Sequence, residues 1–421
     1  MNVFKTAADA ADWITGTRWK GEKHGLENTR ALLSQLGDPE LRMGKILHVA
    51  GTNGKGSTCA YLDAALRECG YRVGLFTSPY LRRFGERIQF DGRPIPDEDL
   101  IDVASRVREA AEALTKREIY CTTFELLTAC ACLYYADKGA DYSVMEVGLG
   151  GRLDSTNVLP SSVSLVAAIG MDHMSLLGNT VEEIAAEKAG IFKPGVPAFV
   201  MPGEPGVMDV FRKAARDAGA PLYICDGGEQ ISYRVDGSDF RCTLPGGECV
   251  TASVHVPGAH QIRNACLALS ALTALPLDRE KVLKGIARAE WPGRLQTKGN
   301  VLIDCGHNPQ GARTLEAYVH TFFADRKIVL LTGMMQDKQI EACSAIFSAF
   351  ADRVVTTAVD WPRALAPEKL AEHYPDKPVC AVSGVENALK EARRQAGEDG
   401  LVVCAGSVYI AGAVLNLLEG K

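Results

Sequence analysis

A short glycine-rich segment carries the most specific chemistry in the sequence. It reads Gly51-Thr52-Asn53-Gly54-Lys55-Gly56-Ser57-Thr58. Glycines let backbone N–H groups close around phosphate oxygens, Lys55 supplies a positive charge, and a hydroxyl after it can bind Mg²⁺. The match to G-x-x-x-x-G-K-[ST] is imperfect, because Val49 occupies the first glycine position and Gly56 separates Lys55 from Ser57. We expect a variant phosphate loop; a glycine-rich turn with a solvated lysine is the alternative.

Two side chains with metal-binding chemistry follow predicted strands. Glu146 stands in the otherwise apolar run 142–147, where a buried carboxylate is costly without a cation or hydrogen bonds. Open parallel sheets bind ligands at the carboxyl ends of their strands, so Glu146 is a candidate Mg²⁺ ligand. An ion pair with an arginine such as Arg152 is the alternative. His173 follows the run 164–169 in the same way, and the residues alone leave a structural histidine open.

Lys188 lies near the end of a predicted helix. Thr180 and Glu183 form a capping-box pattern at its start, and Gly190 is a natural stop. A lysine in the last turn is stabilised by the helix dipole. These residues alone favour an ordinary C-terminal lysine.

The elements that must position these side chains are apolar runs that alternate with helix-period segments. The predicted strands are 45–50, 73–77, 142–147, 164–169, 198–201, 301–304, 328–332, 353–357, 379–382 and 401–404. Such alternation is typical of an α/β protein with parallel sheets. A helix is expected over 57–69, and the glycine-rich stretch 222–256 indicates antiparallel hairpins. Asp304 and His307 follow the run 301–303, with Pro309 suited to the first turn of the next helix.

A Pro-Gly pair in the segment 291–296 indicates a linker between two domains. We therefore predict a larger N-terminal domain, 1–290, which contains the phosphate loop and a parallel sheet, as in P-loop ATPases. A smaller Rossmann-like α/β domain then covers 297–421.

Composition limits the partners and the compartment. The chain has 421 residues, and its 46 Lys and Arg against 52 Asp and Glu give a net charge of −6, which argues against general nucleic-acid binding. Its 13 cysteines lie mostly within apolar runs and form no CxxC pair, so a reducing cytoplasm is expected. No export signal is visible at the N-terminus. Residues 401–418 carry no charge, but Gly406-Ser407 splits them into a strand and a helix, so no membrane span is predicted.

The motifs resemble those of a known family in their order and spacing. The loop GTNGKGST after ILHVA resembles the phosphate loop of the Mur ligase superfamily. Other segments are similar to folylpolyglutamate synthases and dihydrofolate synthases: HGLENTRALLSQLGDPE (24–40), TSPYLRRFGERI (77–88), EVGLGGRLDSTN (146–157), MDHMSLLG (171–178), AAEKAGIFKPG (185–195), HQIRNACLAL (260–269), WPGRLQ (291–296), DCGHNPQGA (304–312) and GSVYIAG (406–412). The chain is identified as a member of that family.

The resemblance implies roles for individual residues. It implies ATP binding by residues 51–58, Asn264, Arg294 and Asp304, and Mg²⁺ binding by Ser78, Glu146 and His173, with Ser57 near the phosphates. It implies that Lys188 is carbamylated and supports the metal site, and it makes Lys55, Lys188 and His173 the catalytic residues. The substrate residues that it implies are Phe124 and Asp154 for a pterin and His307 and Ser407 for glutamate. Phe124 could equally belong to the core, and Arg294 could be an exposed linker residue.

The function that the resemblance implies is ATP-dependent amide formation. ATP and Mg²⁺ convert the carboxylate of a reduced folate to an acyl phosphate, which the amino group of L-glutamate attacks. The expected partners are these small molecules, without nucleic acid or membrane, and the expected protein is a cytoplasmic monomer.

Several alternatives stay open at this stage. A single-activity dihydrofolate synthase would use dihydropteroate instead, and a nucleotide-binding regulator would lack ligase activity. A peptidoglycan-precursor ligase is disfavoured, because only about fifty residues precede Gly51. The family usually has TSPHL where this chain has Tyr80 in Thr77-Ser78-Pro79-Tyr80-Leu81, so contacts of that side chain are in question. The one-carbon form of the folate, the product length and a K⁺ requirement are also open.

Overall fold

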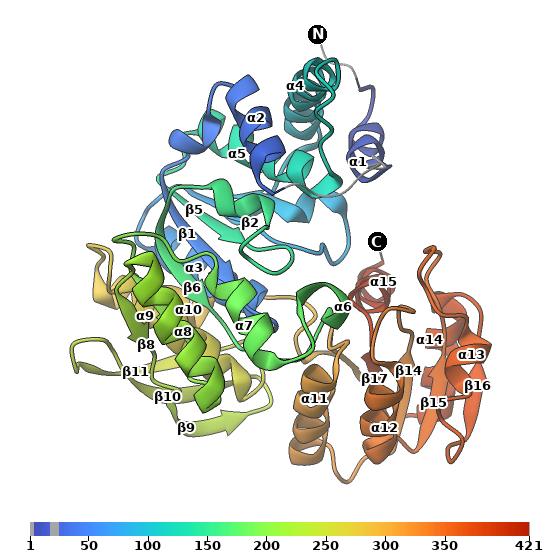
Figure 1. The fold of residues 1–421 in the computed structure, drawn as a ribbon. Helices are drawn as coiled ribbons and strands as arrows, with labels where there is room; N and C mark the ends of the chain where they lie inside the picture. Colours follow the sequence, from blue (N-terminus) through green and yellow to red (C-terminus); the bar gives the residue numbers. More distant parts are fainter. Residues whose placement is uncertain (1–3, 17–24, 421) are drawn as a thin grey trace. The chain divides into compact units, whose positions relative to one another are not determined.

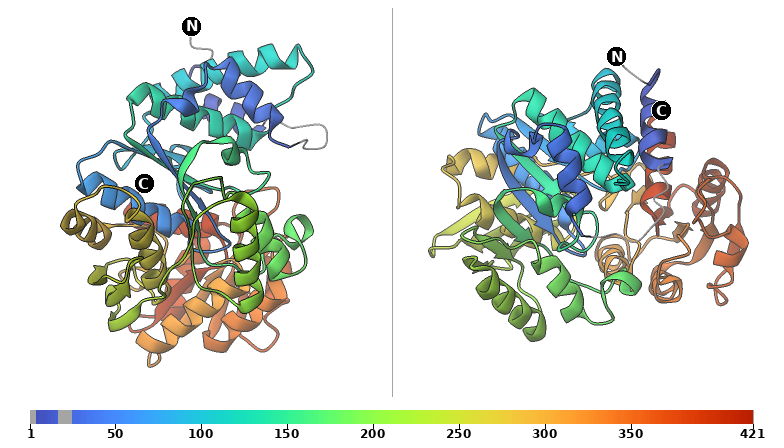
Figure 2. Two further views of the ribbon diagram at one scale, coloured as in Figure 1. Left: turned by 60° about the vertical axis from the view of Figure 1, so that its left-hand side comes forward. Right: turned by 45° about the horizontal axis from the view of Figure 1, so that its top comes forward.

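The chain folds into two compact units. The computed structural model describes residues 4–16 and 25–420. Of these, the first unit takes the residues within Met1–Ile231, Asp239–Val254 and Gln261–Ala289, and the second takes those within Ser232–Ser238, His255–His260 and Glu290–Lys421. Figure 1 shows the elements of both units, and Figure 2 gives two further views. Each unit has its own sheet.

The sheet of the first unit is mostly parallel. Within the described residues it has eight strands in the order β4-β3-β2-β5-β1-β6-β7-β8. The strands are β1 (Lys45–Ala50), β2 (Val73–Phe76), β3 (Ile88–Phe90), β4 (Arg93–Pro94), β5 (Tyr142–Glu146), β6 (Ser161–Val166), β7 (Ala198–Val200) and β8 (Leu222–Ile224). All neighbours from β2 to β8 pair in parallel, and β3 and β4 extend one edge as antiparallel strands.

Helices cover both faces of this sheet, as Figures 1 and 2 show. The helices of the first unit are α1 (Ala7–Gly16), α2 (Glu27–Gln35), α3 (Lys55–Glu68), α4 (Asp97–Thr115), α5 (Thr123–Lys138), α6 (Met174–Leu177), α7 (Val181–Ala189), α8 (Pro205–Ala218), α9 (His260–Leu272) and α10 (Arg279–Arg288), with short 3₁₀ helices η1 (Pro39–Leu41), η2 (Phe84–Arg87) and η3 (Ser155–Val158).

The sheet faces follow from the alternation of side chains along each strand. Met145 of β5 packs in a core with α1, α2, α4 and α5, and Val147, just after β5, packs with α7 and α8. Glu146 lies between these two residues, so its side chain points to the opposite face, where α3 packs on β1, β2 and β5. The phosphate-loop helix and the carboxylate therefore share one face.

The segment 222–256 corrects part of the sequence interpretation. Residues 222–224 form β8, which pairs in parallel with β7 at the edge of the large sheet instead of starting a hairpin. The rest forms a separate three-stranded sheet in chain order, from β9 (Glu229–Arg234), β10 (Gly237–Thr243) and β11 (Cys249–Val254). The short run Leu222-Tyr223-Ile224 could not distinguish the two outcomes, because pairing partners are not encoded locally.

The second unit is built around a mixed sheet. The described strands have the order β12-β13-β17-β14-β15-β16, and only β12 pairs antiparallel with its neighbour. They are β12 (Gln296–Lys298), β13 (Val301–Ile303), β14 (Ile328–Thr332), β15 (Arg353–Thr356), β16 (Val379–Ala381) and β17 (Leu401–Ala405). The helices are α11 (Pro309–Phe322), α12 (Ile340–Phe350), α13 (Pro367–Ala371), α14 (Val385–Ala396) and α15 (Val408–Glu419). The predicted α/β class is confirmed.

The uncharged stretch near the C-terminus divides as predicted. Leu401–Ala405 is strand β17, and α15 begins at Val408 with the Ser407 side chain as its N-cap. Among the residues that the structure describes, no helix is long and apolar enough to cross a membrane. All thirteen cysteines are free thiols, and Cys249 alone of them is exposed.

Candidate active site

The glycine-rich loop joins β1 to α3 and is held by the segment after β6. Thr52 N and Asn53 N donate to Ala168 O at 2.8 and 3.2 Å. The Thr52 hydroxyl donates to Gly170 O at 3.0 Å and accepts from Gly170 N at 3.1 Å. Gly54 has φ +86° at the N-cap of α3, a conformation that favours glycine. The loop is therefore fixed at the carboxyl end of β1, with the helix N-terminus beginning at Lys55.

Glu146 lies next to this loop because β5 and β1 are neighbours, with Val49 paired to Glu146. Its side chain is nearly buried. One carboxylate oxygen, Oε2, accepts from Ser78 N at 3.1 Å, and Oε1 lies 3.9 Å from Lys55 Nζ. The alternative partner Arg152 pairs instead with Glu187 at 2.8 Å. The structure thus brings Lys55, Ser78 and Glu146 together.

His173 lies at the start of α6, after the segment that contacts the loop. It has φ +51°, and its ring Nε2 is 3.9 Å from Asp172 Oδ1. Its side chain is 39% exposed, so it faces solvent more than Glu146 does. Within the described ranges, no three His, Cys, Asp or Glu side chains form a metal-binding group. Glu146 and His173 are thus not members of such a three-residue group among these residues.

Lys188 is buried, a property that its local pattern of an ordinary lysine at a helix C-terminus does not indicate. The capping box of Thr180 and Glu183 is confirmed, and α7 ends at Ala189. The Lys188 side chain nevertheless points inward, with the residue only 4% exposed. Burial, reinforced by the nearby charge of Lys55, lowers its pKa from 10.5 to about 7, and Asp172 and Asp154 oppose that change. Burial therefore favours the uncharged amine much more than in a solvated lysine.

Asp154 is buried and anchors the loop that follows β5. Its Oδ2 accepts from Gly148 N and Leu149 N at 3.1 and 2.9 Å, and its Oδ1 accepts from Thr156 N at 3.0 Å. The carboxylate therefore holds the backbone beside Glu146 in place.

Phe124, at the start of α5, is half-buried. A Cβ on Gly148 would lie 2.4 Å from its ring, so the ring lies directly on that glycine. It also packs against Phe76, with the ring centroids 5.7 Å apart. The core and substrate interpretations of Phe124 both agree with this place, since the ring adjoins both the core and the loop after β5.

Asn264 of α9 is buried against the phosphate loop. Its Oδ1 would lie 2.3 Å from a Cβ on Gly54, and its Nδ2 donates to Gln261 Oε1 at 3.0 Å. Gln261 in turn donates to Ser57 Oγ at 3.2 Å. Sequence analysis missed Gln261, although it lies three residues before Asn264, the spacing that places two side chains on one helix face.

In the second unit, Asp304 begins the turn after β13. It is buried, and it accepts from Leu295 N at 3.0 Å and from Gly306 N at 2.7 Å. Burial raises its pKa, and the charge of Arg294 opposes that change. Arg294 thus lies close to Asp304, within the same unit.

His307 and Ser407 lie on neighbouring turns of the second unit. The turn after β13 carries His307, and the turn after β17 carries Ser407; Gly406 N of one donates to Gly306 O of the other at 2.9 Å. The His307 Nδ1 is 3.1 Å from Cys305 O, and Ser407 Oγ accepts from Tyr409 N at 3.2 Å. Both residues therefore lie at the carboxyl ends of adjacent parallel strands.

Tyr80, which departs from the family pattern, has its own packing partners. Its ring faces Phe84 at a centroid distance of 6.3 Å, and the Arg87 guanidinium lies 5.1 Å from its centroid. Tyr80 lies two residues after Ser78, and Ser78 N donates to the Glu146 carboxylate. The tyrosine in place of the family's usual histidine therefore does not prevent this contact.

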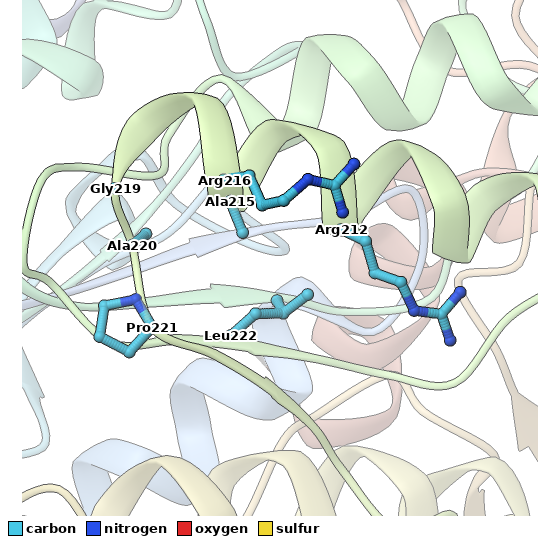
Figure 3. Close-up of a pocket in the computed structure, with 7 residues that line it drawn as sticks. All are labelled: Arg212, Ala215, Arg216, Gly219, Ala220, Pro221 and Leu222. Atoms are coloured by element: carbon cyan, nitrogen blue, oxygen red, sulfur yellow. The ribbon is translucent and has the colours of Figure 1, made fainter.

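An open surface hollow between α8 and β8 lies away from these residues. Figure 3 shows the side chains that line it: Arg212, Ala215, Arg216, Gly219, Ala220, Pro221 and Leu222. It lies at the amino end of β8, whereas the phosphate loop follows the carboxyl end of β1. The neighbouring strands β1, β6, β7 and β8 are all parallel. The hollow therefore lies at the end of the sheet where these strands begin, and the loop lies at the end where they finish.

Comparison with protein families assigns both parts of the chain to one class. Residues 49–272 match the Mur ligase middle domain, and residues 288–408 match the Mur ligase glutamate ligase domain. The chain therefore belongs to the Mur ligases. Within that class, the chain belongs to the folylpolyglutamate synthase/dihydrofolate synthase family.

Full-length relatives support this assignment. The Bacillus subtilis dihydrofolate synthase/folylpolyglutamate synthase is 34% identical, covering 99% of this chain and 100% of the relative. Escherichia coli FolC in complex with DHPP and ADP has a TM-score of 0.88 at 29% identity, over 99% of this chain and 98% of that one. The bifunctional Yersinia pestis enzyme, complexed with AMPPNP and Mn ion, has a TM-score of 0.87 at 31% identity, over 100% and 99% of the two chains.

Proposed function

We propose that this protein is an ATP-dependent ligase that joins L-glutamate to the carboxylate of a reduced folate. The observation that carries the proposal is the meeting of the phosphate loop, the Lys55–Glu146 pair and the buried Lys188 within the first unit. Relatives along the whole chain bear the corresponding enzyme names. The reaction forms an amide and cleaves ATP to ADP and phosphate.

The phosphate loop is the proposed binding site for ATP. Backbone N–H groups of residues 51–58 and the N-terminus of α3 favour the negative phosphates. Lys55 adds a positive charge that stabilises the transferred phosphoryl group. Asn264, beside Gly54, is assigned to the same nucleotide, as are Arg294 and Asp304 of the second unit.

The donor set near Lys55 fits a divalent metal. Mg²⁺ prefers oxygen ligands, and Glu146 offers a buried carboxylate whose Oε1 lies 3.9 Å from Lys55 Nζ. Ser57, Ser78 and His173 are the other proposed ligands. When bound, the metal neutralises charge on the phosphate oxygens. A second oxygen of Glu146, Oε2, stays on Ser78 N and fixes the carboxylate.

Lys188 is the proposed site of carbamylation. The ammonium group first loses a proton; the uncharged amine then attacks the carbon of CO₂, an N–C bond forms as one C=O electron pair moves to oxygen, and a second proton is released. The cation thereby becomes an anion. The lowered pKa of about 7 supplies the uncharged amine at neutral pH. The anion would replace the repulsion between Lys188 and Lys55 with attraction, which supports the catalytic role proposed for this residue.

The reaction itself needs positioning more than covalent catalysis. A folate carboxylate oxygen attacks the γ-phosphorus and ADP leaves; the glutamate nitrogen then attacks the carbonyl carbon of the acyl phosphate, loses a proton, and phosphate leaves. Phe124 and Asp154 are assigned to the folate, and His307 and Ser407 to glutamate. Holding the reactants in place supplies much of the rate enhancement.

The acceptor is proposed to be tetrahydrofolate and, in addition, dihydropteroate. The names of the Bacillus subtilis and Yersinia pestis relatives include both activities, which favours a bifunctional enzyme over a single-activity one. We also propose that the protein acts as a cytoplasmic monomer, since each unit carries its own predicted substrate residues.

Glutamate-dependent ADP release tests the proposal. Purified protein with Mg-ATP receives tetrahydrofolate or dihydropteroate in separate reactions, with and without glutamate. Release that needs both acceptor and glutamate is expected. Glu146→Gln should abolish it, whereas Glu229→Gln, which alters an exposed carboxylate paired with Arg241, should not. A Glu146→Gln variant with full turnover would contradict the assigned site.

A further inference from the structure

Gln261 is a buried polar residue of α9, a helix whose residues are mostly buried. It lies in the first turn of α9 and is completely inaccessible to solvent. A buried amide is costly unless its donor and acceptor groups are bonded. Its bonds run to α3, the helix into which the phosphate loop leads: Nε2 donates to Ser57 Oγ at 3.2 Å, and Oε1 accepts from Tyr61 Oη at 3.4 Å.

A second hydrogen bond to the Gln261 oxygen determines which way the side-chain amide is turned. Asn264 Nδ2 also donates to Gln261 Oε1, at 3.0 Å. With two donors on the oxygen, the amino group of Gln261 must face Ser57. Ser57 Oγ therefore accepts one hydrogen bond, which leaves one lone pair and its own proton for other partners.

We propose that Gln261 is a positioning residue that orients the Ser57 hydroxyl for nucleotide and Mg²⁺ binding. Asn264 reaches the same loop through Gly54, whose absent Cβ would meet Asn264 Oδ1 at 2.3 Å. The Asn264 amide thus lies against Gly54, before Lys55, and the Gln261 amide bonds to Ser57, after Lys55. This inference rests on the proposed function, since it gives the Ser57 hydroxyl a use in binding the substrate.

A purely structural tie between α9 and α3 is the competing explanation, and Tyr61 provides the matched control. Tyr61→Phe removes a hydrogen bond to the same amide while Ser57 keeps its partner. A structural tie predicts similar effects for Tyr61→Phe and Gln261→Met. Orientation of the Ser57 hydroxyl predicts an effect on nucleotide binding for Gln261→Met alone.

The test is a double-mutant cycle on nucleotide binding. The dissociation constant of Mg·ADP is measured by calorimetry, without folate or glutamate, for wild type, Gln261→Met, Ser57→Ala and the double variant. We expect Gln261→Met to weaken binding about tenfold, and to add less than twofold once Ser57 is already alanine. Tyr61→Phe should stay within twofold of wild type. Thermal melting confirms that each variant is folded.

A second variant covers the case in which Gln261→Met does not fold. Gln261→Glu keeps the shape but replaces the amino donor with an acceptor, so Ser57 would donate to it and lose its orientation. Gln261→Glu is measured alone and combined with Ser57→Ala in the same double-mutant cycle. We expect it too to weaken Mg·ADP binding about tenfold alone, and to add less than twofold once Ser57 is alanine.

Three results would overturn the inference: an unchanged dissociation constant in the Gln261 variants, additive effects of the Gln261 and Ser57 changes, or an equal loss in Tyr61→Phe. Each leaves the proposed ligase activity standing, because turnover is assayed separately. Conversely, a non-additive cycle in a protein without folate-dependent turnover would refute the ligase proposal and retain the role of Gln261 in nucleotide binding.

Discussion

The burial of Lys188 makes a quantitative prediction about stability and pH. A pKa lowered from 10.5 to about 7 corresponds to about 5 kcal/mol against the charged amine in the folded state, at about 1.4 kcal/mol per pKa unit. Below pH 7 both the folded and unfolded chains hold the proton, so the full cost is present. Between pH 7 and 10.5 only the unfolded chain holds it, so the free energy of unfolding rises with pH.

Lys188→Met removes this cost. The variant should exceed wild type in unfolding free energy by about 5 kcal/mol at pH 6 and by about 2 kcal/mol at pH 9. The assay is urea unfolding of both proteins at each pH in buffer free of CO₂. The matched control is Lys213→Met, because that side chain is 72% exposed and paired with Asp217; its difference from wild type should not change with pH.

Bicarbonate gives a second, independent comparison. Carbamylation removes the cation, so added bicarbonate should stabilise wild type and leave Lys188→Met unchanged. A difference between wild type and Lys188→Met that stays constant from pH 6 to pH 9, or that grows with pH, would refute the argument that Lys188 is a destabilising buried cation.

Three further predictions concern the phosphate loop and its metal. Lys55→Ala should lower kcat by about 10³-fold in the ADP-release assay because it removes the charge facing the phosphates; a loss below tenfold would contradict that role. Thr52→Val should weaken Mg·ADP binding about tenfold by calorimetry, since it breaks both hydrogen bonds to Gly170, whereas Thr314→Val on the exposed side of α11 should not; equal affinities would count against it. Removing divalent metal with EDTA should stop turnover and adding Mg²⁺ or Mn²⁺ should restore it; turnover that persists in EDTA would exclude the proposed metal site.

Local sequence patterns were sufficient for most of the elements. The predicted strand 328–332 coincides with β14, and the Thr180–Glu183 pattern forms the capping box of α7. Hydrophobic alternation and capping act over a few residues, so they can be read without knowing the fold. The order of strands also explains why the glycine-rich loop and Glu146 meet, because β1 and β5 are neighbours.

The contacts that the sequence could not predict are long-range. The local pattern favoured an ordinary lysine at a helix C-terminus, and it did not indicate that the fold buries Lys188 near Lys55, which is far away in the chain. Arg152 was the nearest candidate partner of Glu146, but Lys55 takes that place. Gln261 contacts a hydroxyl 204 positions away. Such pairings depend on how helices and strands pack, which short-range periodicity does not specify.

The most direct measurement follows oxygen from the folate carboxylate to phosphate. Tetrahydrofolate carrying ¹⁸O in its terminal carboxylate is incubated with Mg-ATP and glutamate, and the products are analysed by mass spectrometry. Ligation through an acyl phosphate predicts a folate heavier by one glutamyl residue and inorganic phosphate that carries ¹⁸O, because a carboxylate oxygen passes to the phosphoryl group. ADP without a glutamylated folate, or phosphate without the label, would contradict ligation through an acyl phosphate.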